Sequence, residues 1–149
     1  MVSKTDRVVI IGKGSIEMII ISATKHKCER ATEKSAGYDL RAGDDANLLP
    51  GQVAVVGTGV FLEMPADVMA MVCSRSGLAS RGIVVNNAPG IVDADYKDEV
   101  KVILINQTDQ PVSFNAGDKI AQLVFTKWVN AGDVVTFHRE GGLGSTGDK

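Results

Sequence analysis

The stretch EVKVILINQTDQPVSFNAGDKIAQLVFT, residues 99–126, consists of short apolar segments separated by polar ones. The apolar segments at 99–105, 111–114 and 119–126 are rich in valine and isoleucine, and asparagine, aspartate, proline and glycine stand between them. β-Branched side chains fit a pleated strand better than a helix, and short apolar runs bounded by turn residues are typical of strands. This stretch therefore predicts three consecutive β-strands.

The rest of the chain repeats this pattern. It contains 19 Val and 11 Ile against 8 Leu, and no segment shows a sustained 3.6-residue apolar period; only residues 76–81 are expected to form one helical turn. Many short strands with frequent turns predict an all-β domain, which is a sandwich, a jelly roll or a small barrel. The expected strands are 8–11, 16–22, 38–42, 52–56, 59–63, 68–73, 83–85, 91–94, 99–105, 111–114, 119–126 and 134–138.

Composition excludes several classes of protein. A length of 149 residues is enough for one domain with a real core. A net charge of −2 argues against nucleic acid as a partner, and apolar runs of about four residues are far too short for a membrane helix. Cys28 and Cys73 lack metal-ligand spacing, so they are expected to be free thiols in a reducing compartment. Because the N-terminus also lacks a signal-peptide pattern, we expect a cytoplasmic protein.

Two glycine-containing segments have the composition of anion sites. In CSRSGLASRG, residues 73–82, serine hydroxyls, arginines and backbone N–H groups can form a cradle for an anion, although a polar loop with a helical turn explains it equally well. In REGGLGSTG, residues 139–147, the glycines oppose independent packing. This tail is either a disordered end or an arm that closes over a phosphate-bearing ligand through Arg139, Ser145 and Thr146.

The segment NNAPGIVDADY, residues 86–96, contains a turn and a carboxylate among apolar residues. Proline followed by Gly90 suits the centre of a type II turn, in which Gly90 would take a positive φ. Burial of Asp93 would be costly unless the carboxylate is paired or functional, so the side chain either faces solvent or serves a site. Asp93 and Tyr96 can line one pocket only if the chain bends between them.

Two further segments, SAGYDLRA at 35–42 and GDKIAQLVF at 117–125, are weak signals alone. An exposed Asp39 and an outward-facing Gln122 are their ordinary explanations. However, AGYDLRA, SRSGLA, NAPGIVDADY, GDKIAQLVF and GGLGSTG together resemble the five motifs of the trimeric dUTPases, in the same order and at comparable spacings.

The resemblance implies a distorted jelly-roll (β-clip) fold and a homotrimer whose three active sites lie at subunit interfaces. It also implies Mg²⁺-dependent hydrolysis of dUTP to dUMP and pyrophosphate, with water attacking the α-phosphorus, which lowers dUTP and supplies dUMP for thymidylate synthesis. Residues 1–15 have their own apolar run and a Gly-Lys-Gly turn, so we expect a short extension packed on the domain. The resemblance then predicts a β domain at 16–138 and a Gly-rich arm at 139–149 that closes the active site. No nucleic-acid or membrane partner is expected.

The resemblance also implies roles for residues around the nucleoside. Asp93 matches the general base that activates the water. Asn87 and its hairpin match the uracil reader, whose tight walls would exclude the 5-methyl group of thymine. Tyr96 matches the ring beneath the deoxyribose, which leaves no room for a 2′-hydroxyl. The expected backbone contacts to the nucleoside come from Ile91, Val92 and Lys101.

Other matched residues would hold the triphosphate and the metal. Asp39 matches the carboxylate that holds Mg²⁺ through water. In the tail, Leu143 would cover the uracil. The residues that match phosphate-binding positions are Arg75, Ser76, Gly77 and Gln122, with Arg139, Ser145 and Thr146 clamping the γ-phosphate.

This chain departs from the family pattern in four places. Leu143 stands where the family usually has phenylalanine, and it follows Arg139 one residue sooner than usual. Ser74 replaces a common proline, and Asp98 replaces a common glycine. Two alternatives stay open: a deoxycytidine triphosphate deaminase, which would need a glutamate acid/base, and a catalytically weak nucleotide sensor or interaction module.

Overall fold

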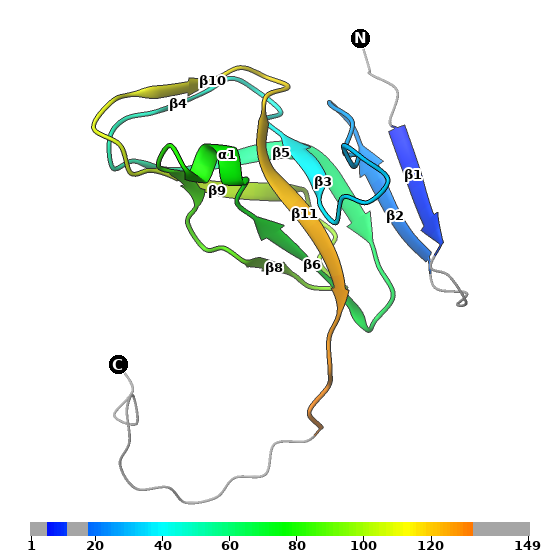
Figure 1. Cartoon of the computed structure of the whole chain (residues 1–149). Coiled ribbons are helices and arrows are strands. Elements are labelled where there is room, and N and C mark those ends of the chain that lie inside the picture. The colour runs from blue at the N-terminus through cyan, green and yellow to red at the C-terminus, as the bar shows by residue number, and fades with distance from the viewer. Residues whose placement is uncertain (1–5, 12–17, 133–149) are drawn as a thin grey trace, which may run out of the picture.

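The computed structural model describes residues 6–11 and 18–132, and almost all regular elements in this part of the chain are strands (Figure 1). Antiparallel pairing joins them into three sheets. The elements are β1 (Asp6–Ile11), β2 (Met18–Ala23), β3 (Tyr38–Arg41), β4 (Ala46–Leu48), β5 (Val53–Glu63), β6 (Val68–Cys73), α1 (Ser76–Ala79), β7 (Ile83–Val85), β8 (Gly90–Val92), β9 (Val100–Asn106), β10 (Val112–Phe114) and β11 (Lys119–Lys127).

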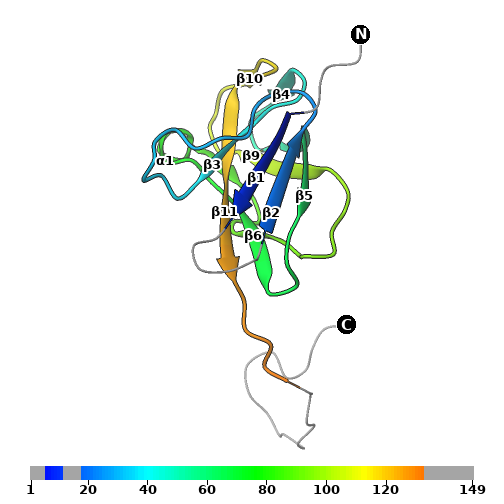
Figure 2. The ribbon, with the colours of Figure 1, turned by 90° about the vertical axis from the view of Figure 1, so that its right-hand side faces the viewer.

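Two of the sheets enclose the core. A five-stranded sheet has the order β1-β2-β5-β9-β7, and a four-stranded sheet has the order β3-β11-β6-β8. In Figure 1, β11 passes in front of β9, and Figure 2 shows the same strands from the side. Alternate side chains of both sheets are buried in one cluster, such as Val102 and Leu104 of β9 and Leu123 of β11. The all-β fold expected from the sequence is confirmed.

The β5 strand differs from the expectation of two strands at 52–56 and 59–63. It is one strand, and its pairing with β9 shifts register between Gly57 and Val60. Gly59 has a φ of +71°, and Gly43 N–H donates to the C=O of Gly57 at 2.8 Å. A bulge, rather than a loop, therefore interrupts the apolar run.

Two other elements differ from the sequence-based expectation. The strand β4 was not expected, and it pairs with β10 in a separate two-stranded sheet. The strand β8 ends at Val92 instead of continuing to residue 94. The single helical turn is present as α1, and the expected strand at 134–138 lies outside the described residues.

The strand β1 lies at the edge of the five-stranded sheet, beside β2 (Figure 1). The proposed division of the chain at residues 15 and 138 stays a prediction. Within the described residues, no helix is long and apolar enough to cross a membrane.

Candidate functional site

One pocket forms beside strand β8 and is called here the β8 pocket. Its volume is about 290 Å³. Strands β5, β6, β8 and β9 and the segments flanking β8 contribute to it. Its lining residues are Val55, Val72, Asn87, Gly90, Ile91, Val92, Tyr96, Val100, Lys101 and Ile103. Among the described residues, the fold thus brings together Asn87, Ile91, Val92, Tyr96 and Lys101, which the resemblance assigned to the nucleoside, whereas Asp93 does not line this pocket.

The turn before β8 is not the predicted type II turn. The Ala88–Pro89 peptide bond is cis, and Gly90 does not have a positive φ. Gly90 is instead a buried strand residue that pairs with Val72 of β6. A Cβ at Gly90 would lie 3.0 Å from Nδ2 of Asn87, so a larger residue here would push the Asn87 side chain away from its present position. The prediction of a positive φ at Gly90 was wrong because local turn preferences carry no information about the pairing of Gly90 with β6.

The chain bends after β8, but the bend brings only Tyr96, and not Asp93, to the β8 pocket. Tyr96 N–H donates to the C=O of Asp93 at 3.1 Å, and Tyr96 O–H donates to the C=O of Glu99 at 2.7 Å. Tyr96 lines the pocket while remaining 37% exposed.

Asp93 has a more open environment than the apolar segment suggested. It follows the last residue of β8, and its side chain is exposed in the single chain. The interpretation of Asp93 as a carboxylate lodged within an apolar strand is therefore wrong for the isolated subunit. The strand ends at Val92, two residues before the expected end, and Asp93 lies on the exposed side of the chain, as Ile91 does.

A second pocket, called here the β3 pocket, is lined by the paired strands β3 and β11, by the segment that precedes β3 and by the segment that follows β6. Its volume is about 340 Å³. Most of its lining side chains are small or polar, and it shares no lining residue with the β8 pocket. The lining residues are Ala31, Ser35, Ala36, Gly37, Asp39, Arg75, Ser76, Gly77 and Gln122. All phosphate and metal residues assigned within the described chain are therefore neighbours here.

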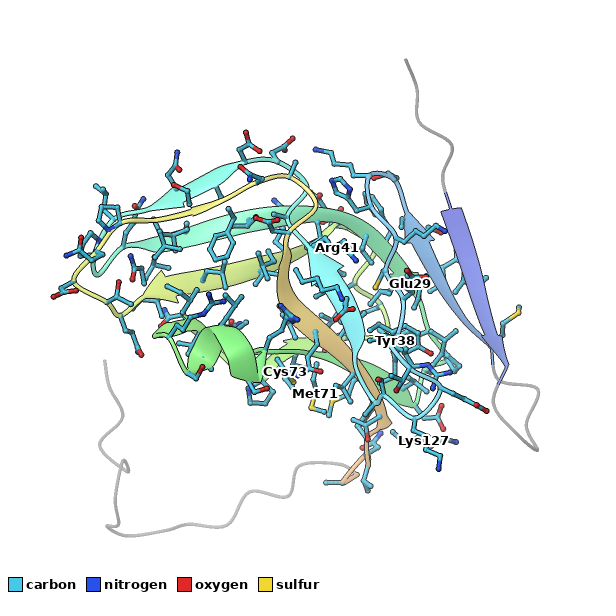
Figure 3. All side chains as sticks on the ribbon, turned by 45° about the horizontal axis from the view of Figure 1, so that its top comes forward. Glu29, Tyr38, Arg41, Met71, Cys73 and Lys127 are labelled. Atoms are coloured by element: carbon cyan, nitrogen blue, oxygen red, sulfur yellow. The ribbon has the colours of Figure 1, made fainter. Side chains whose placement is uncertain are left out.

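Strand pairing positions the polar groups of the β3 pocket. Gln122 of β11 lies opposite Asp39 of β3 and Cys73 of β6, and its Nε2 donates to the C=O of Ser74 at 3.0 Å. Figure 3 shows Tyr38 and Arg41 of β3 on one side of β11 and Cys73 on the other. A Cβ at Gly37 would overlap Oε1 of Gln122, so glycine provides the space for this amide. Gln122 is consequently not a simple outward-facing side chain.

A lysine that the sequence analysis did not assign fixes the carboxylate in this pocket. Lys119 Nζ lies 3.1 Å from Oδ2 of Asp39, whose side chain is only 14% exposed. Arg75 reaches the same strand, because its NH1 donates to the C=O of Lys119 at 3.2 Å. The β3 pocket therefore contains one paired carboxylate and the cationic Arg75.

The acidic side chain in the β3 pocket suits a metal ion that is held through water rather than by direct protein ligands. Among residues 6–11 and 18–132, no group of three or more His, Cys, Asp or Glu side chains could hold a metal ion directly. Asp39 alone fits an ion that keeps its waters and binds mainly to phosphate oxygens, which is typical of Mg²⁺.

Several assigned residues are not placed by the structure. Arg139, Leu143, Ser145 and Thr146 lie outside the described residues. The interpretation of 139–147 as a closing arm therefore stays a prediction.

Comparison with known proteins shows the family to which the chain belongs. The dUTPase family model matches residues 23–147. Curated relatives named deoxyuridine 5'-triphosphate nucleotidohydrolase include one from Anaeromyxobacter sp., 46% identical over 78% of this chain and 84% of its own length. Another, from Anaplasma marginale, is 44% identical over 78% of this chain and 86% of its own length. The chain belongs to the dUTPase family.

Solved structures show the same fold. The dUTPase from Streptococcus mutans superposes with a TM-score of 0.67 at 28% identity, covering 70% of this chain and 88% of that one. A dUTPase from phage phi11 of S. aureus, described with a structural Mg(II) ion, gives 0.70 at 23% identity, covering 82% of this chain and 99% of that one. This second similarity shows the fold alone.

Proposed function

We propose that this chain hydrolyses dUTP to dUMP and pyrophosphate. The observation that carries the proposal is the separation of the family's motif residues into two pockets of different chemistry. Apolar side chains and backbone groups line much of the β8 pocket, which suits a base and a sugar. A cation, hydroxyls and an amide line the β3 pocket, which suits phosphates.

The β8 pocket would bind the deoxyuridine. The close packing of Asn87 on Gly90 brings its amide beside the backbone of β8, where polar groups can pair with the uracil edge. Ile91, Val92 and Lys101 complete the walls. Tyr96 would lie beneath the deoxyribose and exclude a 2′-hydroxyl.

The β3 pocket would bind the triphosphate. Arg75 and the hydroxyl of Ser76 offer donors to phosphate oxygens, Gly77 leaves the backbone accessible, and Gln122 adds an amide. When bound, Mg²⁺ would neutralise phosphate charge, and Asp39 would hold it through water. Lys119 would keep the Asp39 carboxylate oriented toward the pocket.

Asp93 would be the general base. In the proposed step, Asp93 accepts a proton from water while the water oxygen forms a bond to the α-phosphorus. The bond between the α-phosphorus and the bridging oxygen breaks, and the pyrophosphate leaves with the electron pair. Exposure of Asp93 in the single subunit is compatible with this role if other groups cover it in the assembled site.

A homotrimer supplies such groups. In the proposed assembly, the β8 pocket of one subunit meets the β3 pocket of a neighbour, and the arm at 139–149 closes over both. The separate linings of the two pockets support this division of labour. In a cytoplasmic setting, the reaction would lower dUTP and provide dUMP for thymidylate synthesis.

Pyrophosphate release from dUTP, dTTP, dCTP and UTP, with and without Mg²⁺, tests the proposal. We expect rapid release from dUTP alone, and only with the metal. Ammonia release from dCTP would instead indicate a deaminase. Tight dUTP binding without pyrophosphate would indicate a sensor or interaction module.

A further inference from the structure

The loop that follows β8 holds Tyr96 by its hydroxyl group. Tyr96 O–H donates to the C=O of Glu99 at 2.7 Å, and Tyr96 N–H donates to the C=O of Asp93. Tyr96 as a whole residue is 37% exposed, so packing contacts cover only part of it. The hydrogen bond from the Tyr96 hydroxyl therefore helps to hold the ring in place. For this bond to fix the ring, the backbone of Glu99 must itself be held in position.

The side chain of Glu99 is attached to the bulge of β5. Gly59 N–H donates to Oε2 of Glu99 at 2.7 Å. A Cβ at Gly57 would lie 2.9 Å from the same oxygen, so glycine leaves room for the carboxylate. A hydrogen bond to an ionised acceptor is stronger than a neutral one.

The next residue along is fixed to the same bulge. Thr58 Oγ1 donates to the C=O of Val100 at 2.6 Å, and Thr58 is buried. Glu99 and Val100 are thus both tied to the three-residue bulge 57–59. This bulge lies about 40 residues earlier in the chain than the loop that it anchors.

We propose that Glu99 is a positioning residue for substrate discrimination: by joining Tyr96 to the β5 bulge, it holds the ring where the ring excludes a 2′-hydroxyl. The inference rests on the proposed dUTP hydrolysis and goes beyond it, since Glu99 does not line the β8 pocket. Steric exclusion requires a rigid wall, and a displacement of about 1 Å is enough to loosen a site.

Substitution of Glu99 tests the proposal through the ratio of kcat/KM for dUTP to kcat/KM for UTP. In Glu99→Ala we expect this ratio to fall about tenfold, the effect of losing one charge-assisted hydrogen bond. The change should come mainly from faster UTP hydrolysis. Glu99→Gln should recover most of the ratio, because its amide oxygen can still accept from Gly59 N–H.

Asp98→Ala is the matched control. It removes the same charge from the neighbouring position, and Asp98 is exposed and makes no hydrogen bond with the residues that the structure describes. In Asp98→Ala, the ratio of kcat/KM for dUTP to kcat/KM for UTP should equal that of the wild type. An equal fall in Asp98→Ala and Glu99→Ala would show a charge effect and overturn the proposal.

Tyr96→Phe keeps the ring and removes only the hydroxyl, so it remains informative if Glu99→Ala does not fold. We expect the same loss of discrimination, with no further loss in the double variant Glu99→Ala/Tyr96→Phe. An unchanged ratio in Tyr96→Phe would overturn the proposal while leaving dUTP hydrolysis intact. Failure of the wild type to release pyrophosphate from dUTP would instead overturn the proposed function itself.

Discussion

Replacement of Thr58 by valine should destabilise the β5 bulge strongly, although the two side chains have nearly the same shape. Thr58 is 1% exposed, and its hydroxyl donates to the C=O of Val100 at 2.6 Å and accepts from Val60 N–H at 3.2 Å. Valine would leave both backbone groups without this partner. Each orphaned buried group costs about 1–3 kcal/mol, and the added methyl group returns about 1 kcal/mol. We therefore expect a loss of about 1–5 kcal/mol in the free energy of unfolding.

Urea unfolding followed by far-UV circular dichroism measures this loss. With a slope of about 2 kcal/mol/M, the midpoint should fall by about 0.5–2.5 M without a change in slope. Protein concentration must be equal in all samples, because assembly contributes to apparent stability. Thr58→Ser keeps the hydroxyl and loses only a methyl group, so it should cost about 1 kcal/mol. If Thr58→Val were no less stable than Thr58→Ser, the hydroxyl would not be what holds the bulge.

The remaining predictions concern the base, the tail and a buried thiol. Asp93→Asn should lower kcat by about 10²–10⁴ with an unchanged Kd for dUTP in calorimetry; near wild-type turnover would exclude Asp93 as the base. Deletion of residues 139–149 should preserve the melting temperature but reduce turnover. Leu143→Phe should lower KM for dUTP several-fold, because the ring adds about 0.5–1.5 kcal/mol of contact. Unchanged kinetics in both variants would show that the tail has no role in catalysis. Burial, with smaller contributions from the charges of Asp39 and Glu29, raises the pKa of Cys28 from 9.0 to about 12. Below pH 9 the Cys28 thiol is protonated in both the folded and the unfolded state, whereas above pH 9 it ionises more readily in the unfolded state. The free energy of unfolding should therefore fall between pH 9 and 12. In urea titrations, Cys28→Ala should flatten that decline.

The strands of this fold were predictable where the local pattern carried the signal. In β9, buried side chains alternate with more exposed ones, as the sequence VKVILIN suggests. The strand β4 carried no comparable signal, because its three residues are stabilised by pairing with β10, more than sixty residues away. The bulge in β5 had a signal, since glycine within an apolar run is typical of bulges. That signal lies in Gly57 and Gly59: residues 57–58 were interpreted as a break between two strands, and Gly59 as the first residue of the second strand.

The candidate site was predictable to the extent that its residues lie in ordered motifs. The described residues to which the motifs assigned a role line two pockets, apart from Asp93. Lys119 and Glu99 were not assigned, because each acts through a partner distant in sequence: Lys119 through Asp39, and Glu99 through Gly59. No local pattern indicates such pairs, since they exist only after the sheets have assembled.

Hydrolysis of dUTP in ¹⁸O-labelled water tests the central claim most directly. If water attacks the α-phosphorus, mass spectrometry should find one ¹⁸O atom in dUMP and none in pyrophosphate. Label in pyrophosphate would show attack at the β-phosphorus and contradict the proposed geometry of Asp93. Absence of both products would contradict the assignment of this chain as an active dUTP-hydrolysing enzyme.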